Sequence, residues 1–350
     1  MTPLAARLAA GLKIHADTVG PKVTEKAAMQ QKLSKCILHI GTPKTGSTAI
    51  QHFLRANYDV LSRRNIIAHV KLANDLAKAF TPWHTRMRFL QKAGLQDPQK
   101  HAQLKTKAVQ ALHEIVSSEA NAKKVVILSS EQLYMMPAQK TDIVAIKEML
   151  KSYFENVDVV CFFRDPVDLV PSSYNQHLRA AYSGSLRTFI SDYIKSTSWK
   201  YFSNYKWWSS VFGADNVFFE PFNPGQLTNY DVVRHFCALL NVDAEGLIFS
   251  HGKRFNLQMS ARLTVVYRLI NVLVPLWKRG KGQQNVLNPA NGKIKSFGKR
   301  LRFLKHGRKL RLTADQREIV RLATYKEYRR MLDHYNSRRN APTRSISETV

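Results

Sequence analysis

A loop that could bind phosphate follows the first strongly apolar run of the chain. Residues 36–40 are apolar and end at Gly41, and a second glycine, Gly46, lies five residues later. When a strand is followed by a loop and then by a helix, the free amides of the loop and the positive end of the helix dipole point at one place. An anion bound at that place is stabilised. A Walker A loop has its lysine directly after the second glycine, whereas here Ser47 occupies that position and Lys44 lies inside the loop. This departure argues against an ordinary ATPase or GTPase; the alternative is a tight turn that caps a helix.

A second pattern suited to anions follows another apolar run, residues 157–163. Arg164 ends that run, and a guanidinium offers an oxyanion a planar fork of donors. Ser172 lies eight residues later, and a helix that starts at Pro166 would bring it back beside the arginine, with Ser173 able to share its role. The alternative is a surface ion pair between Arg164 and a neighbouring aspartate.

These two segments together resemble the sulfotransferases that use 3′-phosphoadenosine 5′-phosphosulfate (PAPS). The family's 5′-phosphosulfate loop reads Pro-Lys-[Thr/Ser/Ala]-Gly-[Thr/Ser]-[Thr/Ser], and its 3′-phosphate element has Arg-x-Pro with a serine eight residues after the arginine. Residues 43–48 fit the first pattern, and Arg164 and Ser172 fit the second, although residues 168–170 lack the second arginine of many members. The resemblance spans residues 36–260 and implies that PAPS, which needs no metal here, is bound by Gly41, Thr42, Pro43, Lys44, Thr45, Gly46, Ser47, Thr48, Arg164 and Ser172. Arg254 and Asn256 are further candidates, in a basic loop that would cover the nucleotide; a plain surface loop is the alternative for that segment.

The same resemblance implies the catalytic roles. Lys44 would stabilise the charge that develops on the leaving oxygen, and the acceptor hydroxyl needs a base. Glu131 is the first choice, because it follows the apolar run 125–128 and several branches of the family use a glutamate; His52 and His39 compete with it. A structural role for Glu131, in capping the next helix or pairing with a lysine, is the alternative.

The elements that must position these residues alternate between apolar runs and helical patterns. The runs 36–40, 125–128, 157–163 and 217–219 are typical of buried parallel strands. The sequence therefore predicts an α/β protein with a P-loop-like three-layer fold, in which a mainly parallel central sheet is flanked by helices. Ligands of such sheets bind at the carboxyl ends of the strands, where the candidate residues lie.

Aromatic residues recur at helical spacing further along the chain. Tyr201, Tyr205, Trp208 and Phe212 are similar to a helix common in carbohydrate sulfotransferases. At this spacing, aromatic side chains are more typical of core than of a substrate site.

The charge of the chain is strongly positive. Lys and Arg number 54 against 25 Asp and Glu, giving a net charge of +29, and residues 246–314 contain no acidic side chain. Such a charge attracts anionic partners, here an acidic glycan or an anionic membrane contacted through residues 278–311, and a merely solvated basic face is the alternative; nucleic acid is disfavoured.

The expected organisation is an N-terminal extension (1–34), a PAPS-binding domain (35–260), a basic helical region packed on it (261–336) and a disordered tail (337–350). Three widely spaced cysteines, with no signal-peptide or spanning pattern, predict a cytoplasmic protein, peripheral on a membrane at most. The predicted function is transfer of a sulfuryl group from PAPS to a hydroxyl or amine of a glycan or glycolipid. The alternatives are a P-loop nucleotide kinase or hydrolase, and a basic protein that binds membranes or polyanions.

Overall fold

A five-stranded parallel sheet forms the centre of the computed structural model. The structure describes residues 32–339 apart from 83–85, 87–89, 92, 119–123, 138, 224, 226, 250–258 and 280–306. The strands are β1 (Leu33–His39), β2 (Ile66–His69), β3 (Val125–Ser129), β4 (Phe154–Phe163) and β5 (Val217–Pro221), in the order β2-β3-β1-β4-β5. Each neighbouring pair is parallel. The predicted α/β class is confirmed, and β2 is an edge strand that the sequence analysis did not predict.

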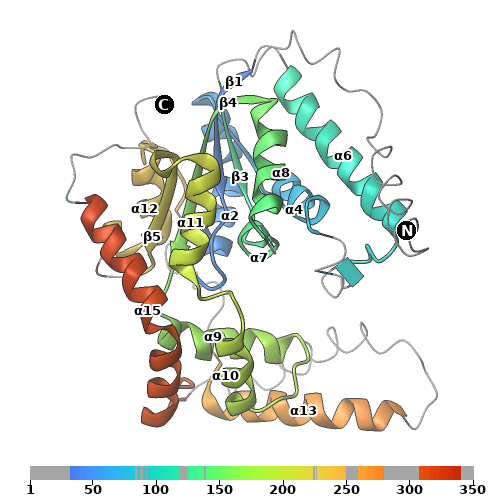
Figure 1. The fold of residues 1–350 in the computed structure, drawn as a ribbon, viewed down its shortest axis with the longest axis vertical. Coiled ribbons are helices and arrows are strands. Elements are labelled where there is room, and N and C mark those ends of the chain that lie inside the picture. Colours follow the sequence, from blue (N-terminus) through green and yellow to red (C-terminus); the bar gives the residue numbers. More distant parts are fainter. Residues whose placement is uncertain are drawn as a thin grey trace, which may run out of the picture.

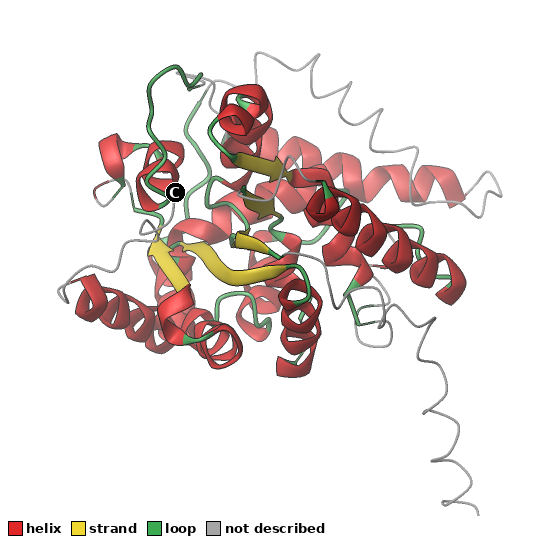
Figure 2. Cartoon of the chain, turned by 90° about the horizontal axis from the view of Figure 1, so that it is seen from above, coloured by secondary structure: helices red, strands yellow, loops and turns green. Residues whose placement is uncertain are grey.

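Helices cover both faces of this sheet (Figures 1 and 2). Their bounds are α2 (Ser47–Ala56), α3 (Tyr58–Arg63), α4 (Val70–Ala79), α6 (Pro98–Ser117), α7 (Gln132–Met135), α8 (Lys140–Lys151), α9 (Pro166–Arg179), α10 (Leu186–Lys195), α11 (Tyr201–Phe212), α12 (Val232–Leu239), α13 (Ala261–Arg279) and α15 (Ala314–Arg339). Alternation along β1 assigns its side chains to the two faces: Leu38 packs toward α4, α8 and α11, and Ile37 toward α2 and α12. The three-layer arrangement is therefore confirmed.

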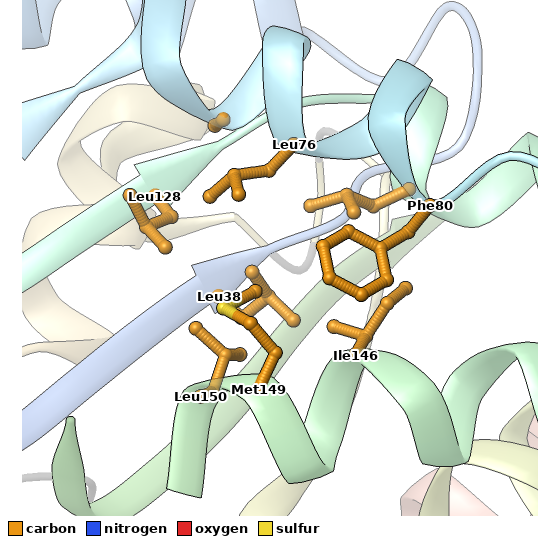
Figure 3. A pocket seen from close by; sticks show the side chains of 9 residues that line it. Leu38, Leu76, Phe80, Leu128, Ile146, Met149 and Leu150 are labelled. Atoms are coloured by element: carbon orange, nitrogen blue, oxygen red, sulfur yellow. The ribbon is translucent and has the colours of Figure 1, made fainter. Parts of the chain in front are cut away.

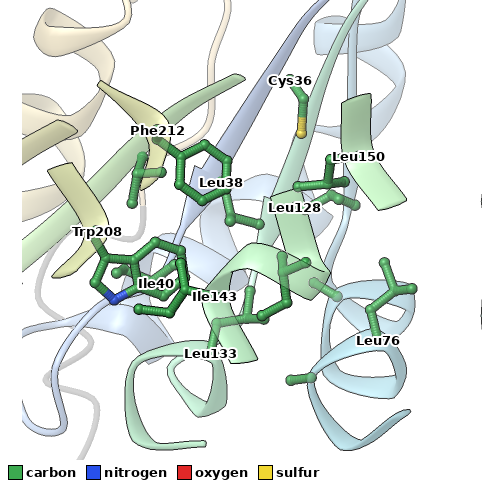
Figure 4. Packing of buried hydrophobic residues seen from close by; sticks show 14 of the residues in the cluster. Cys36, Leu38, Ile40, Leu76, Leu128, Leu133, Ile143, Leu150, Trp208 and Phe212 are labelled. Atoms are coloured by element: carbon green, nitrogen blue, oxygen red, sulfur yellow. The ribbon is translucent and has the colours of Figure 1, made fainter. Parts of the chain in front are cut away.

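The larger core lies between the sheet and the layer of α4, α6, α8 and α11 (Figure 4). Tyr201, Tyr205, Trp208 and Phe212 are all buried there, on the inner face of α11. These aromatic side chains therefore form core, as their helical spacing indicated. A small cavity between the sheet and helices α4 and α8 is lined by apolar side chains, among them Leu38, Phe80 and Met149, and belongs to this core (Figure 3).

A third cluster of apolar side chains joins helices outside the two layers of the sheet. It combines residues of α9, α10, α13 and α15, for example Tyr174, Phe189, Leu263 and Val320. Figure 1 shows α9, α10 and α13 together on one side of the molecule, beyond one end of the strands. Helix α9 connects this helical layer to β4, so the layer stands against the edge of the sheet where the candidate site is expected.

Two C-terminal helices, α13 and α15, pack on the preceding elements. Thr313 caps α15, because its hydroxyl accepts the amide hydrogen of Gln316 at 3.3 Å. The helix continues to Arg339, so the tail expected from Ser337 has its first residues in a helix. Arg338 ties this end of the helix to the fold, since its guanidinium donates to the carbonyl oxygens of Ala214 and Val217 at 2.7 and 3.1 Å. Residues 1–31 and 340–350 lie outside the described residues.

No helix in the described ranges combines the length and the apolar character that crossing a bilayer requires.

Candidate functional site

The candidate residues converge where three strands end. β1 lies between β3 and β4, with His39 level with Ser129 on one side and with Val160 on the other. The loop after β1, Glu131 after β3 and Arg164 after β4 therefore leave the sheet at one edge, as predicted.

Two hydrogen bonds anchor the loop after β1 to the end of β4. The amide and the hydroxyl of Thr42 both donate to the carbonyl oxygen of Phe162, at 3.2 and 2.8 Å. The hydroxyl of Thr45 in turn donates to the carbonyl oxygen of Thr42 at 2.6 Å. Thr42 and Thr45 are both buried, so these bonds are shielded from water and fix the path of the loop.

The loop has the backbone of an anion cradle. Lys44 (φ 67°) and Gly46 (φ 87°) are both left-handed, and Gly46 is the N-cap of α2. The amides of Lys44, Gly46 and Ser47 donate to no other group among the described residues. The buried hydroxyl of Ser47 has no hydrogen-bond partner there either. Unsatisfied donors at a helix start, together with a strained non-glycine residue, are typical of a phosphate site.

Close packing beneath the loop explains both glycines. A Cβ on Gly41 would lie 2.5 Å from the Ser47 hydroxyl and 3.0 Å from Nε2 of His39, and a Cβ on Gly46 would lie 2.6 Å from Cγ1 of Val232. A larger residue at either position would push on side chains that hold the loop.

His39 supports the loop from below. Its ring is fully buried, and Nδ1 is 2.8 Å from the hydroxyl oxygen of Ser129. Burial lowers the pKa of His39 to about 3, so the ring is neutral at physiological pH. This environment favours a role in positioning β1 and β3 over the role of base considered for His39.

Charged side chains surround the ammonium group of Lys44. Burial, and then the nearby Arg179 guanidinium, lower the pKa of Lys44; the Glu131 carboxylate raises it, and Arg164 lowers it further. The cations therefore outnumber the carboxylate in this group, and an anion bound among them would relieve the repulsion. Lys44, Glu131 and Arg164, predicted from separate segments, are brought together.

Glu131 is half-buried and free of the structural roles considered for it. Its side chain does not cap α7, and its carboxylate makes no hydrogen bond or close ion pair with another described residue. Burial raises the pKa of Glu131, and the nearby Lys44 ammonium partly lowers it again. A carboxylate with a raised pKa beside a phosphate-type loop is suited to accept a proton.

Arg164 precedes α9 and lies over an aromatic ring. Its guanidinium carbon is 5.6 Å from the centre of the Phe222 ring, and it forms no salt bridge with the described residues. Asp165 instead caps α9, since its carboxylate accepts the amide hydrogen of Val167 at 2.8 Å. Helix α9 starts at Pro166 as predicted and runs through Pro171, which leaves Ser172 half-buried in its second turn.

The other candidates lie in different surroundings. His52 is exposed on α2, whereas its neighbour Gln51 turns inward and donates to the carbonyl oxygen of Ser129 at 3.4 Å. Arg254 and Asn256 lie outside the described residues. No group of three or more His, Cys, Asp or Glu side chains in the described ranges is arranged to hold a metal ion.

Comparison with known families decides what kind of protein carries this site. A family model described as "Sulfotransferase domain" matches residues 34–237, more than half of the chain, and this stretch contains the phosphate-type loop, Glu131 and Arg164. The chain belongs to the sulfotransferase domain family. The family makes it a transferase.

Solved structures of sulfotransferases are also similar to this chain. A sulfotransferase from Alicyclobacillus acidocaldarius is 17% identical, with a TM-score of 0.38, over 68% of this chain and 92% of that one. The sulfotransferase domain from the curacin biosynthetic pathway is 14% identical, with a TM-score of 0.34, over 76% of this chain and 98% of that one. A sulfotransferase domain from the Synechococcus PCC 7002 olefin synthase is 14% identical, with a TM-score of 0.34, over 84% and 94% of the two chains. No curated protein matches the sequence at a significant level.

One residue of the candidate site, Arg179, was missed by the sequence analysis. It ends α9, is half-buried and is the nearby charge that most lowers the pKa of Lys44. The signal was its spacing from Ser172, because residues seven apart lie on one face of a helix. A helix that brings Ser172 toward the loop therefore brings Arg179 to the same side.

Proposed function

We propose that the protein transfers the sulfuryl group of PAPS to a hydroxyl or amine of a glycan or glycolipid. The observation that carries the proposal is Lys44: it lies inside the phosphate-type loop, and its charged neighbours are Glu131, Arg164 and Arg179. In a member of the sulfotransferase domain family, an ammonium group with a carboxylate and two guanidiniums near it supports sulfuryl transfer at this loop.

The residues present suit a nucleotide with two anionic ends. The free amides of Lys44, Gly46 and Ser47, with the unpartnered Ser47 hydroxyl, form a donor set for a 5′-phosphate. Arg164 and Ser172, at the start of α9, would hold a 3′-phosphate. The Phe222 ring beneath Arg164 limits the directions in which the guanidinium can turn.

Each residue then has a role in transfer. The donor supplies a sulfur atom that forms a bond to the acceptor oxygen or nitrogen as its bond to the phosphate oxygen breaks. Lys44 stabilises the negative charge that develops on that phosphate oxygen, and Glu131 takes the proton of the acceptor. Burial serves both roles, since it strengthens the field of the ammonium and raises the proton affinity of the carboxylate.

The charge around the site supports an acidic acceptor. The cations beside the loop outnumber the nearby carboxylate, and the whole chain carries a net charge of +29. Such a field attracts anionic substrates and raises their local concentration. A cytoplasmic setting is part of the proposal, because the three cysteines are free and buried, which suits a reducing compartment.

Nucleotide binding tests the donor assignment. We expect 3′-phosphoadenosine 5′-phosphate to raise the thermal unfolding midpoint more than adenosine 5′-phosphate does. Arg164→Ala should remove this difference between the two nucleotides, whereas Arg187→Ala, an exposed arginine on α10, should retain it. A folded wild-type protein whose midpoint stays constant at saturating 3′-phosphoadenosine 5′-phosphate would contradict the proposal.

A transfer screen tests the acceptor. Labelled PAPS would be incubated with neutral and acidic glycans and glycolipids, and labelled products counted. The proposal expects label on one class of these acceptors and preference for acidic members. Label transferred to none of them by a protein that binds the nucleotide would exclude this acceptor class and leave the donor assignment standing.

A further inference from the structure

Helix α13 is fastened to the fold by polar side chains. The amide nitrogen of the Asn271 side chain donates to the carbonyl oxygens of Leu178 and Tyr182, at 2.8 Å each, and the Thr264 hydroxyl donates to the Asn175 side chain at 3.1 Å. Asn271 and Thr264 are both buried, alongside Leu263 and Tyr267. The face of α13 that is turned toward α9 therefore carries polar side chains that form hydrogen bonds with the rest of the fold.

The opposite face of α13 is aliphatic and exposed. Val265, Leu269, Val272 and Leu273, here called the α13 stripe, are exposed by 58, 55, 40 and 59%. Their spacing of four, three and one residues places them on one side of the helix over more than two turns. Figure 1 shows α13 at the border of the molecule, on the side of α9 and α10 away from the sheet.

This arrangement departs from the usual pattern of a surface helix. Such a helix normally presents polar side chains to water, whereas α13, which already buries Leu263 and Tyr267 on its inner face, also carries an aliphatic stripe on its outer face. Contiguous exposed apolar side chains indicate contact with another surface.

Cations lie on α13 beside the α13 stripe and at the start of the helix. Arg262 and Arg268 are exposed on α13 itself. The amide of Ala261 donates to the carbonyl oxygen of Arg308 at 2.9 Å, and Ser260 pairs with Lys309, which brings the exposed Arg308 and Arg311 to the start of the helix. Acidic side chains are missing from the whole sequence between residues 246 and 314. The covering surface must therefore be apolar at its centre and negative around it.

We propose that α13 lies on an anionic lipid surface, with the α13 stripe among the acyl chains and the surrounding arginines on the headgroups. An interfacial helix combines these two features, an apolar face and a basic border. A second copy of the chain fits poorly, because it would bring Arg262 and Arg268 against the same cations. The proposal stands whether or not the transfer chemistry proposed above is correct.

Vesicle sedimentation with the full-length chain tests this docking. Wild-type protein should sediment with phosphatidylcholine vesicles that contain phosphatidylglycerol and stay in solution with phosphatidylcholine alone. Leu269→Gln combined with Leu273→Gln should weaken partitioning at least about tenfold, because two exposed leucines no longer enter the lipid. Arg308→Gln with Arg311→Gln should weaken it roughly tenfold and reduce its dependence on salt.

A matched control lies on α15. Ile319 and Leu322 are exposed by 50 and 74%, but Leu322 adjoins Arg321, which is paired with Glu318. Ile319→Gln with Leu322→Gln should therefore leave sedimentation unchanged, and circular dichroism should report the same helix content for every variant. The proposal would be overturned if the wild type and the variant with Leu269→Gln and Leu273→Gln sedimented equally. It would also be overturned if the wild type did not sediment with anionic vesicles. A wild type that instead dimerises through the α13 stripe would assign the face to a second copy and overturn it as well.

Discussion

Thr42 donates both its amide and its hydroxyl hydrogen to one acceptor, the carbonyl oxygen of Phe162, at 3.2 and 2.8 Å. These two hydrogen bonds link the phosphate-type loop to β4, and Arg164 follows two residues after Phe162. The loop and the arginine would bind the two ends of one nucleotide, so their separation must be fixed. Thr42 fixes it, and its burial keeps water from competing for the carbonyl.

Replacing Thr42 by valine tests this link. Thr42→Val removes the hydroxyl bond and leaves the amide bond, so the free energy of unfolding should fall by about 1 kcal/mol. The affinity for 3′-phosphoadenosine 5′-phosphate, measured by calorimetry, should fall severalfold because the loop can shift relative to Arg164. Thr81→Val is the control, since the buried Thr81 hydroxyl donates to the carbonyl oxygen of Ala77 at 2.7 Å, at the end of α4. If both variants lose equal stability and equal affinity, the Thr42 bond has no special effect on binding.

Lys44 should contribute to transfer at the expense of stability. Burial and the neighbouring arginines disfavour its charge, as its lowered pKa indicates. Lys44→Met should therefore raise the unfolding midpoint of the free protein while lowering kcat/KM for sulfuryl transfer about 10²–10³-fold, the usual loss when a donor to a developing oxyanion is removed. Lys71→Met, at an exposed position on α4, should change neither quantity. A stable Lys44→Met protein with the wild-type rate would remove Lys44 from the mechanism.

The pH dependence of kcat/KM should report Glu131 and Lys44 together. Burial raises the pKa of Glu131 and lowers that of Lys44, and each charge partly offsets the shift of the other. Transfer needs the carboxylate ionised and the ammonium protonated. Activity should therefore rise with pH along a limb above the usual glutamate range and fall along a limb below the usual lysine range.

Glu131→Gln separates the two limbs. The acid limb should disappear with the carboxylate, and the alkaline limb should move to lower pH because the charge that raises the pKa of Lys44 is gone. The profile is measured with saturating acceptor and subsaturating donor. An acid limb that persists in Glu131→Gln would assign the base to another group, such as His52.

The strands that carry the site could be predicted because they are continuous apolar runs that end in chemically distinctive residues. β2 could not, since residues 66–69 form a strand of only four residues at the edge of the sheet, and only the first two of their side chains are buried. The approach of Glu131 to Lys44 also depends on strand order. In the sheet, β3 pairs directly with β1, and β2 lies on the far side of β3. The order of the strands along the chain does not determine which of them pairs with β1.

Substitution of Gly46 should show how closely the cradle is packed. Gly46 has φ 87°, and an added Cβ would lie 2.6 Å from Cγ1 of Val232, whereas Gly94 has φ 73° with open space around its Cβ position. Gly94→Ala should therefore cost only the backbone strain, about 1 kcal/mol, and leave nucleotide affinity unchanged. Gly46→Ala should carry the same strain and a clash of about 1–3 kcal/mol more. It should also weaken binding of 3′-phosphoadenosine 5′-phosphate at least tenfold, as the Ser47 amide is displaced. Chemical denaturation and calorimetry measure both effects, and equal losses in the two variants would show that α12 yields to the added methyl and that the loop is not held by that contact.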